Sequence, residues 1–290
     1  MKKLLLKVIF FIILFFILDY ILYSGLFIFF NKPRFEQYLD KNTEVVFFGD
    51  SRFLSGINPR VIKELYNIYG YNMAPQGSSI ISARGMEAVV MHHYLPKIAV
   101  LEVMNLDHER SARQNLAPYY YLPEIRKLLQ IYPYHVRLTY EYIKSSRYNS
   151  LILHIIRDNL IKADKGNMGY KPLYGSVKSL AALALTKQSL IKNGVAILTE
   201  FIEQARMNNV GVVFVEMPTL RGDRSQSHDD YVAAALKYDI PFLDYSKEGK
   251  DFFALPQSCF YDATHLNDRG AAIFSVILGE KLVQLIPKKD

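Results

Sequence analysis

The architecture of this chain can be worked out from one stretch, Glu44-Val45-Val46-Phe47-Phe48-Gly49-Asp50-Ser51. The apolar run from Glu44 to Phe48 is typical of a short buried strand, and Gly49-Asp50-Ser51 then supplies a tight polar turn. Asn58-Pro59 follows and opens a helix, with proline in its favoured first turn. A buried strand that leads directly into a helix is the usual beginning of an α/β domain.

The same alternation continues along most of the chain. The pattern predicts helices over about residues 79–94, 186–207, 229–238 and 268–285, and strands over 98–104, 210–216 and 241–243. Strands that alternate with helices form a mostly parallel sheet covered on both faces. We therefore expect an α/β fold, a doubly wound three-layer sandwich of the flavodoxin-like kind.

The alternation is interrupted between about residues 111 and 185. Between Ser111 and Ala196, Lys and Arg exceed Asp and Glu by nine, and ten of the 21 tyrosines of the chain lie in this stretch. We interpret residues 111–185 as a basic, tyrosine-rich helical insertion. The predicted organisation is an anchor over residues 1–30, a linker over 31–43 and an α/β domain over 44–290. The insertion could bind anionic groups and sugar rings or lipid headgroups, or it could be a helical cap with solvated charges.

The N-terminal segment is apolar enough to cross a membrane. Residues Val8 to Phe30 contain one charge, Asp19, and follow the basic residues Lys2, Lys3 and Lys7. At 1.5 Å per residue this run spans a hydrocarbon core of about 30 Å. A cleaved signal peptide is the alternative, but the run is longer than usual and no Ala-x-Ala-like site follows it. We expect a single-pass anchor with the domain on the extracytoplasmic side.

Composition and motifs exclude several classes of protein. The 290 residues are 50% hydrophobic and 22% charged, which excludes a disordered chain. The single cysteine, Cys259, excludes an intramolecular disulfide and a cysteine-based metal framework. Phosphate-binding glycine motifs are missing from the sequence, and an anchored extracytoplasmic domain is not expected to bind nucleic acid despite a net charge of +7.

Two polar motifs lie where predicted strands end or the last helix begins. Ser51 follows the first strand, and Asp262-Ala263-Thr264-His265 precedes the last helix. A serine hydroxyl needs a base to become a nucleophile, and a histidine base works best when a carboxylate orients it. Ser51, His265 and Asp262 are therefore the candidate nucleophile, base and orienting acid. The structural alternative is that Asp50 and Ser51 form an ordinary helix cap.

These motifs resemble the first and last blocks of the SGNH/GDSL hydrolase superfamily. The resemblance implies an oxyanion hole formed by the backbone N–H of Ser51, by Gly77 and by Asn105. The usual Gly-x-Asn-Asp block is replaced by Val103-Met104-Asn105-Leu106-Asp107. With the anchor and the insertion, the chain looks most like the membrane-anchored DltD-like and alginate-acetylation-like branch, which modifies cell-envelope polymers.

The expected function is acyl transfer to an anionic cell-envelope glycopolymer through an acyl-serine, without a metal or organic cofactor. An extracytoplasmic esterase or deacylase, and a non-catalytic partner of an acyltransferase complex, are the alternatives. Asp19 lies in the middle of the apolar run, where a carboxylate is costly. We expect it to face a multi-spanning membrane O-acyltransferase. The alternatives are a protonated Asp19 tolerated in lipid, a self-associating pair of anchor helices, or a helix shifted so that Asp19 reaches the edge of the bilayer.

Overall fold

The structure is a computed structural model that describes residues 1–35, 42–106, 111–149, 151–153, 155–156, 167–177 and 193–287. The chain divides into two compact units. We call Met1–Tyr38 with Arg113–Ala163 the anchor unit, and Leu39–Ala112 with Asp164–Asp290 the sheet unit. Each unit is described separately.

The sheet unit contains a five-stranded parallel sheet. Its strands are β1 (Val45–Phe48), β2 (Gly70–Asn72), β3 (Ile98–Glu102), β4 (Gly211–Glu216) and β5 (Phe242–Asp244), in the order β2-β1-β3-β4-β5. This is the flavodoxin-like strand order. The α/β prediction is confirmed, whereas β2, which has only three residues, had not been predicted as a strand.

Alternate side chains of β1 are buried against opposite helical layers, which explains why the strand is apolar throughout. Phe47 contacts Phe53 of α2 (Ser51–Gly56), with ring centroids 6.3 Å apart. Phe48, on the other face, contacts Phe201 of α9 (Gly194–Met207), with centroids 5.6 Å apart. All four residues of β1 are buried.

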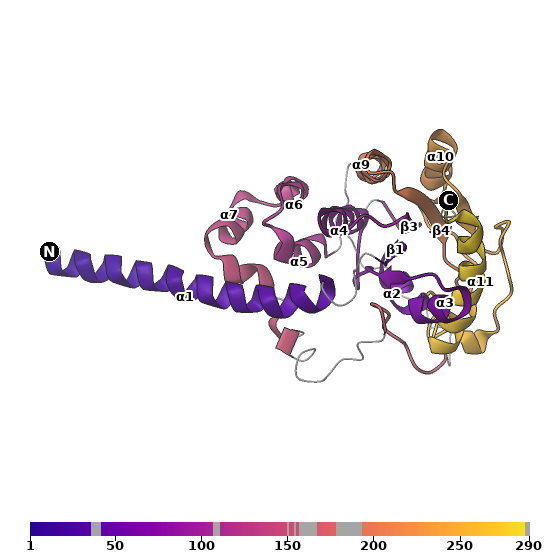
Figure 1. Cartoon of the computed structure of the whole chain (residues 1–290), viewed down its shortest axis with the longest axis horizontal. Coiled ribbons are helices and arrows are strands. Elements are labelled where there is room, and N and C mark those ends of the chain that lie inside the picture. Colours follow the sequence, from indigo (N-terminus) through magenta and orange to yellow (C-terminus); the bar gives the residue numbers. More distant parts are fainter. Residues whose placement is uncertain are drawn as a thin grey trace. The chain divides into compact units, whose positions relative to one another are not determined.

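Helices cover both faces of the sheet. On one face α11 (Asp268–Leu285) packs on α2 and on α3 (Pro59–Tyr66), as Figure 1 shows. On the other face α4 (Ile80–His93) packs on α9, and both α9 and α10 (His228–Tyr238) contact β4. A short 3-10 helix, η4 (Gln257–Cys259), precedes α11. The first residues of the helix predicted from residue 186 lie outside the described residues.

Residues 167–177 belong to the sheet unit, although the sequence pattern had included them in the insertion. Four backbone hydrogen bonds hold this segment, from Asn72 N to Met168 O, from Lys171 N to Leu54 O, from Val177 N to Phe260 O and from Asp268 N to Leu173 O. The segment therefore lies along elements that come from both ends of the sheet unit.

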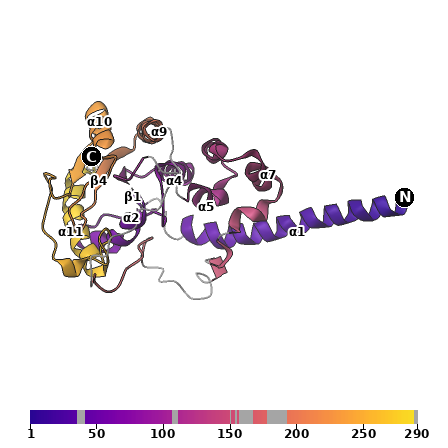
Figure 2. The same cartoon turned by 180° about the vertical axis from the view of Figure 1, so that it is seen from behind.

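The anchor unit consists of one long helix and several short ones. The long helix is α1 (Lys2–Phe35), and Lys2–Phe30 is the one segment among the described residues that is long and apolar enough to cross a membrane. The short elements are α5 (Ala112–Leu116), η1 (Ala117–Tyr119), α6 (Pro123–Leu128), η2 (Leu129–Ile131), α7 (Tyr134–Tyr142) and η3 (Lys144–Tyr148). Figure 2 shows α1 and these short helices from behind.

Candidate active site

Ser51 is the first residue of α2, directly after the turn that leaves β1. Asp50 caps the helix, because its Oδ1 accepts a hydrogen bond from the backbone N–H of Arg52 at 2.8 Å. A Cβ at Gly49 would lie 2.8 Å from the Cβ of Glu102 and 2.8 Å from the Phe53 ring. Any side chain at position 49 would therefore displace the turn that presents Ser51.

Asp262 and His265 lie on a tight turn that Asp262 itself stabilises. Its Oδ1 accepts hydrogen bonds from the backbone N–H groups of Thr264 and His265, both at 2.8 Å. Tyr261 N donates to His265 O at 2.9 Å, which closes the turn. Burial raises the pKa of Asp262, but these hydrogen bonds and the charge of His265 outweigh it, and the net pKa is lowered.

The structure brings Ser51, His265 and Asp262 together from opposite ends of the chain. Ser51 Oγ lies 2.8 Å from His265 Nε2, and His265 Nδ1 lies 2.9 Å from Asp262 Oδ2. When Nδ1 carries the ring proton and donates it to Asp262, Nε2 is free to accept the proton of the Ser51 hydroxyl. The arrangement can activate a serine, and an ordinary cap does not require the histidine.

The two other predicted oxyanion-hole residues, Gly77 and Asn105, each follow a strand of the sheet. Gly77 follows β2 with φ +64°, a conformation that disfavours any other residue. Asn105 follows β3, and its side-chain N–H donates to Gln226 Oε1 at 2.7 Å. Ser51, as the first residue of a helix, presents its N–H at the helix end. The assignment of Gly77 and Asn105 to an oxyanion hole therefore stays a prediction.

Sequence reasoning missed a row of buried acids at the carboxyl edge of the sheet. Glu102, Glu216 and Asp244 are the last residues of β3, β4 and β5, and all three are buried. Glu102 Oε2 accepts a hydrogen bond from Asp50 N at 2.7 Å, and its Oε1 lies 2.7 Å from Arg52 Nε. Glu102 thus fastens both neighbours of Ser51 to β3.

Arg52 is the cation of this row. Besides Glu102 it contacts Glu216 Oε1 at 4.0 Å and donates to Val103 O at 2.8 Å. Burial raises the pKa of Glu102 and that of Glu216, and the Arg52 guanidinium opposes both shifts. Two buried carboxyl groups that share one guanidinium favour retention of a proton. The acidic residues at the ends of β3, β4 and β5 were the sequence signal for this network.

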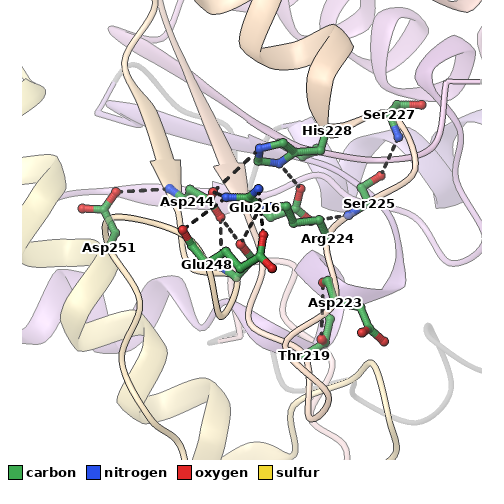
Figure 3. Close-up of polar contacts among 12 residues, drawn as sticks. Glu216, Thr219, Asp223, Arg224, Ser225, Ser227, His228, Asp244, Glu248 and Asp251 are labelled. Carbon is green, nitrogen blue, oxygen red and sulfur yellow. Dashed lines mark hydrogen bonds and ion pairs between the residues drawn. The ribbon is translucent and has the colours of Figure 1, made fainter.

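The network continues across the sheet to a second histidine (Figure 3). His228 Nδ1 lies 3.2 Å from Glu216 Oε2, and its Nε2 lies 3.8 Å from Asp244 Oδ2. Arg224 contacts Asp244 Oδ2 at 3.1 Å and Ser246 Oγ at 3.2 Å. These contacts hold the loop after β4 against the end of β5. Among the residues that the structure describes, no group of three His, Cys, Asp or Glu side chains is arranged to bind a metal ion.

No protein-family model and no curated relative matches the sequence. Solved structures are similar in backbone, among them three that are each 12% identical in sequence. A protein described as an acylhydrolase from Bacteroides fragilis NCTC 9343 has a TM-score of 0.42, with 86% of this chain and 90% of that chain covered. A GDSL-like lipase from Bacteroides thetaiotaomicron VPI-5482 has a TM-score of 0.42, with 86% and 92% covered. A protein described as lipolytic and of the G-D-S-L family, from Desulfitobacterium hafniense DCB-2, has a TM-score of 0.41, with 82% and 99% covered. At this low similarity, the chemistry of this chain has to be inferred from its own site.

Proposed function

We propose that this chain is a serine acyl-transfer enzyme of the SGNH/GDSL type with Ser51 as its nucleophile. The observation that supports the proposal best is the 2.8 Å approach of Ser51 Oγ to His265 Nε2, with Asp262 on the other ring nitrogen. The serine and the histidine are 214 residues apart in the sequence, so local structure does not account for their meeting. A histidine base has to lie within hydrogen-bond distance of the serine hydroxyl and of an orienting carboxylate, and both distances support the proposal.

The proposed reaction has two halves. His265 Nε2 takes the Ser51 proton while Oγ attacks the acyl carbonyl, and the electron pair of the carbonyl moves to its oxygen. When the tetrahedral intermediate collapses, His265 gives that proton to the departing alcohol and an acyl-serine remains. In the second half His265 removes a proton from the acceptor hydroxyl, whose oxygen attacks the acyl-serine carbonyl. When this second tetrahedral intermediate collapses, the bond to Ser51 Oγ breaks, His265 returns the proton to Oγ, and the acylated acceptor leaves. Asp262 keeps the imidazolium oriented throughout.

The acceptor decides between a transferase and an esterase. We infer a hydroxyl of an anionic envelope glycopolymer as the acceptor, from the resemblance to the DltD-like branch and from the basic insertion. In that resemblance a multi-spanning membrane O-acyltransferase supplies the acyl group. Water as the acceptor would make the chain an esterase.

The proposal is tested by trapping Ser51 with a fluorophosphonate. We expect one covalent adduct, located at Ser51 by peptide mass spectrometry, and expect none in Ser51→Ala. His265→Ala should label far more slowly, because the serine loses its base. An adduct at another residue would refute Ser51 as the nucleophile, and equal labelling in His265→Ala would refute His265 as its base.

Transferase and esterase activity are separated by the fate of the acyl group. An acyl ester donor is supplied with and without a glycopolymer acceptor, and free acid and acylated polymer are both measured. We expect polymer acylation that requires Ser51, with little free acid. Free acid alone, at the same rate with and without polymer, would assign the site to an esterase.

A further inference from the structure

The exposure of side chains along helix α1 changes at Asp19. Every residue from Met1 to Leu18 is exposed, whereas the Asp19 side chain is 8% exposed. In Figures 1 and 2 the N-terminal half of α1 extends alone, away from the short helices of the anchor unit. The apolar run is therefore two segments, one without neighbours in the described structure and one packed on protein.

Asp19 is bound by its own chain. Its carboxylate accepts hydrogen bonds from the backbone N–H groups of Lys144 at 2.8 Å and Ser145 at 3.1 Å, and from Ser145 Oγ at 2.6 Å. These donors belong to the start of η3. The acid in the middle of the apolar run thus fastens the insertion to the helix, and a membrane partner would have to share or replace these contacts.

The helix after Asp19 uses one face for packing. Tyr23, Phe27 and Phe30 lie four and three residues apart, which places them along one side of α1. Their rings contact those of Tyr148 and Tyr121, with centroids 6.2 Å apart for Tyr23 with Tyr148 and 5.6 Å for Phe27 with Tyr121. This half of α1 is the core helix of the anchor unit.

A buried cation lies in the same core. Arg147 is 6% exposed, and its guanidinium lies 5.4 Å from the centre of the Tyr23 ring and 5.3 Å from that of Tyr120. Its Nε donates to Tyr140 O at 2.8 Å. A full bilayer crossing by residues 8–30 would place this charge, Asp19 and the irregular backbone of η3 at mid-membrane depth. Lipid-exposed irregular backbone is not tolerated there, and buried charges are costly.

We propose that the membrane boundary lies at Asp19 and Tyr20. The bilayer is crossed by residues up to Leu18, and the rest of α1 with residues 112–149 forms a platform on the lipid headgroups. We call residues 19–30 and 112–149 the platform. Because the platform needs Tyr23 and Arg147 together, this assignment also requires that α1 is retained rather than cleaved. The inference does not depend on Ser51.

The lengths and side chains agree with this boundary. Leu4 to Leu18 rises about 22 Å and contains one charge, Lys7, in its first turn. The long side chains of Lys2, Lys3 and Lys7 can extend their charges to the headgroups, and local thinning of the bilayer can close the shortfall from about 30 Å. The only aromatic residues before position 19 are phenylalanines, and the first tyrosine is Tyr20. Tyrosine is enriched at the membrane–water interface. Lys144 Nζ lies 5.5 Å from the centre of the Tyr20 ring, which places a cation at the same level.

The platform has the chemistry of a surface for anionic lipids. Tyr134 is 66% and Tyr142 62% exposed, and Tyr142 lies two residues before Lys144. Residues 112–149 contain six Lys or Arg against two Glu. Basic residues next to a membrane crossing are attracted to anionic headgroups. Lys144, whose backbone N–H binds Asp19, and the exposed tyrosines of the platform fit that layer.

Depth measurements test the boundary. Single cysteines replace Ile12, Ile21 or Ile28 of α1, which are 51%, 61% and 53% exposed, in the full chain carrying Cys259→Ala. Each is spin-labelled in phosphatidylethanolamine–phosphatidylglycerol vesicles, and collision with oxygen is compared with collision with a water-soluble nickel complex. We expect position 12 to be deep, 21 to lie at headgroup depth and 28 to be aqueous.

The opposite order would overturn the proposal. If residues 8–30 cross the bilayer, position 21 is deepest and positions 12 and 28 are both shallow. A fourth label at Tyr142→Cys should match the depth of position 21, because both lie near Asp19. An aqueous reading at position 142 would refute the lipid surface. An anionic surface would also be refuted if the label at position 142 lay equally deep with and without phosphatidylglycerol and high salt moved it toward water in neither kind of vesicle.

Asp19 variants test the link inside the unit. Asp19→Leu makes the segment more apolar, yet it removes the acceptor of the Lys144 and Ser145 backbone donors. We expect proteolysis between residues 143 and 149 to be about tenfold faster in Asp19→Leu. Asp19→Asn, which keeps an acceptor oxygen, is the matched control and should change this rate less. Equal protection in all three proteins would show that Asp19 does not hold η3.

Discussion

Replacement of Asp262 by asparagine changes one of the two carboxylate oxygens that face the imidazole, since Oδ1 lies 3.0 Å and Oδ2 2.9 Å from His265 Nδ1. Oδ1 accepts hydrogen bonds from the backbone of Thr264 and His265, and asparagine can keep that oxygen. The other atom lies 2.9 Å from His265 Nδ1, where asparagine would place an N–H donor. Nδ1 would then accept, its proton would move to Nε2, and Nε2 could no longer take the Ser51 proton.

The expected effect on the reaction is large and that on stability is small. A wrong tautomer lowers kcat by about 10⁴-fold, a barrier increase of about 5 kcal/mol. Stability should fall only slightly at neutral pH, because the Asp262 side chain is 36% exposed and solvent screens its charge. The lowered pKa of Asp262 means that its contribution is present above the usual aspartate range and is lost as the pH falls through that range. The melting temperatures of the two proteins should therefore converge in acid.

The assay is hydrolysis of p-nitrophenyl acetate by the full chain in detergent, with the rate of fluorophosphonate labelling of Ser51 as a second measure. Asp230→Asn, on the exposed side of α10, is the matched control and should leave both rates unchanged. If Asp262→Asn kept more than about a tenth of the activity, the proposed role of the carboxylate would be wrong. A drop in melting temperature of more than about 6 °C would mean that the turn itself had been lost.

Substitutions at three further positions test the surroundings of Ser51. Glu102→Ala leaves Arg52 short of its nearest charge and should cost about 3–5 kcal/mol, measured by urea unfolding, whereas Glu102→Gln should cost less. Because burial raises the pKa of Glu102, the stability of the natural chain relative to Glu102→Gln should decline as the pH rises from about 5 to about 9, and a difference that grows would contradict this sign. Gly49→Ala should slow labelling of Ser51 and lower the melting temperature, since its Cβ would meet Glu102 and Phe53; an unchanged protein would show that the turn can yield. Asn105→Ala should lower kcat by about 10²- to 10³-fold with little change in KM if its amide stabilises the oxyanion, and a full kcat would remove it from the site.

The elements around the site could be predicted because they depend on local patterns. The apolar run before Gly49 is buried on both faces of the sheet, so its hydrophobicity alone indicates a central parallel strand. Asp262 and His265 lie three residues apart, so one turn presents both. The strand order and the 2.8 Å meeting of Ser51 with His265 agree with an α/β arrangement whose polar residues gather at the carboxyl edge.

Other features depended on strand register and long-range packing, which no local pattern contains. Glu102 lies inside the strand predicted over residues 98–104, and only the tertiary structure ends β3 there and places the Glu102 carboxylate against Arg52 and the backbone of Asp50. Asn105 followed the expected strand, yet its contact with Gln226 depends on a loop 121 residues away.

The N-terminal helix illustrates the division most clearly. The sequence by itself determined that residues 8–30 form one apolar helix with a single acid, since hydropathy and length are local properties. Only the tertiary structure showed that η3 binds Asp19 and that the helix is packed on protein beyond it. The physical reason is that an apolar face suits lipid and a protein core equally well, and the aromatic residues that cover it here lie about 90 to 125 positions away in the sequence.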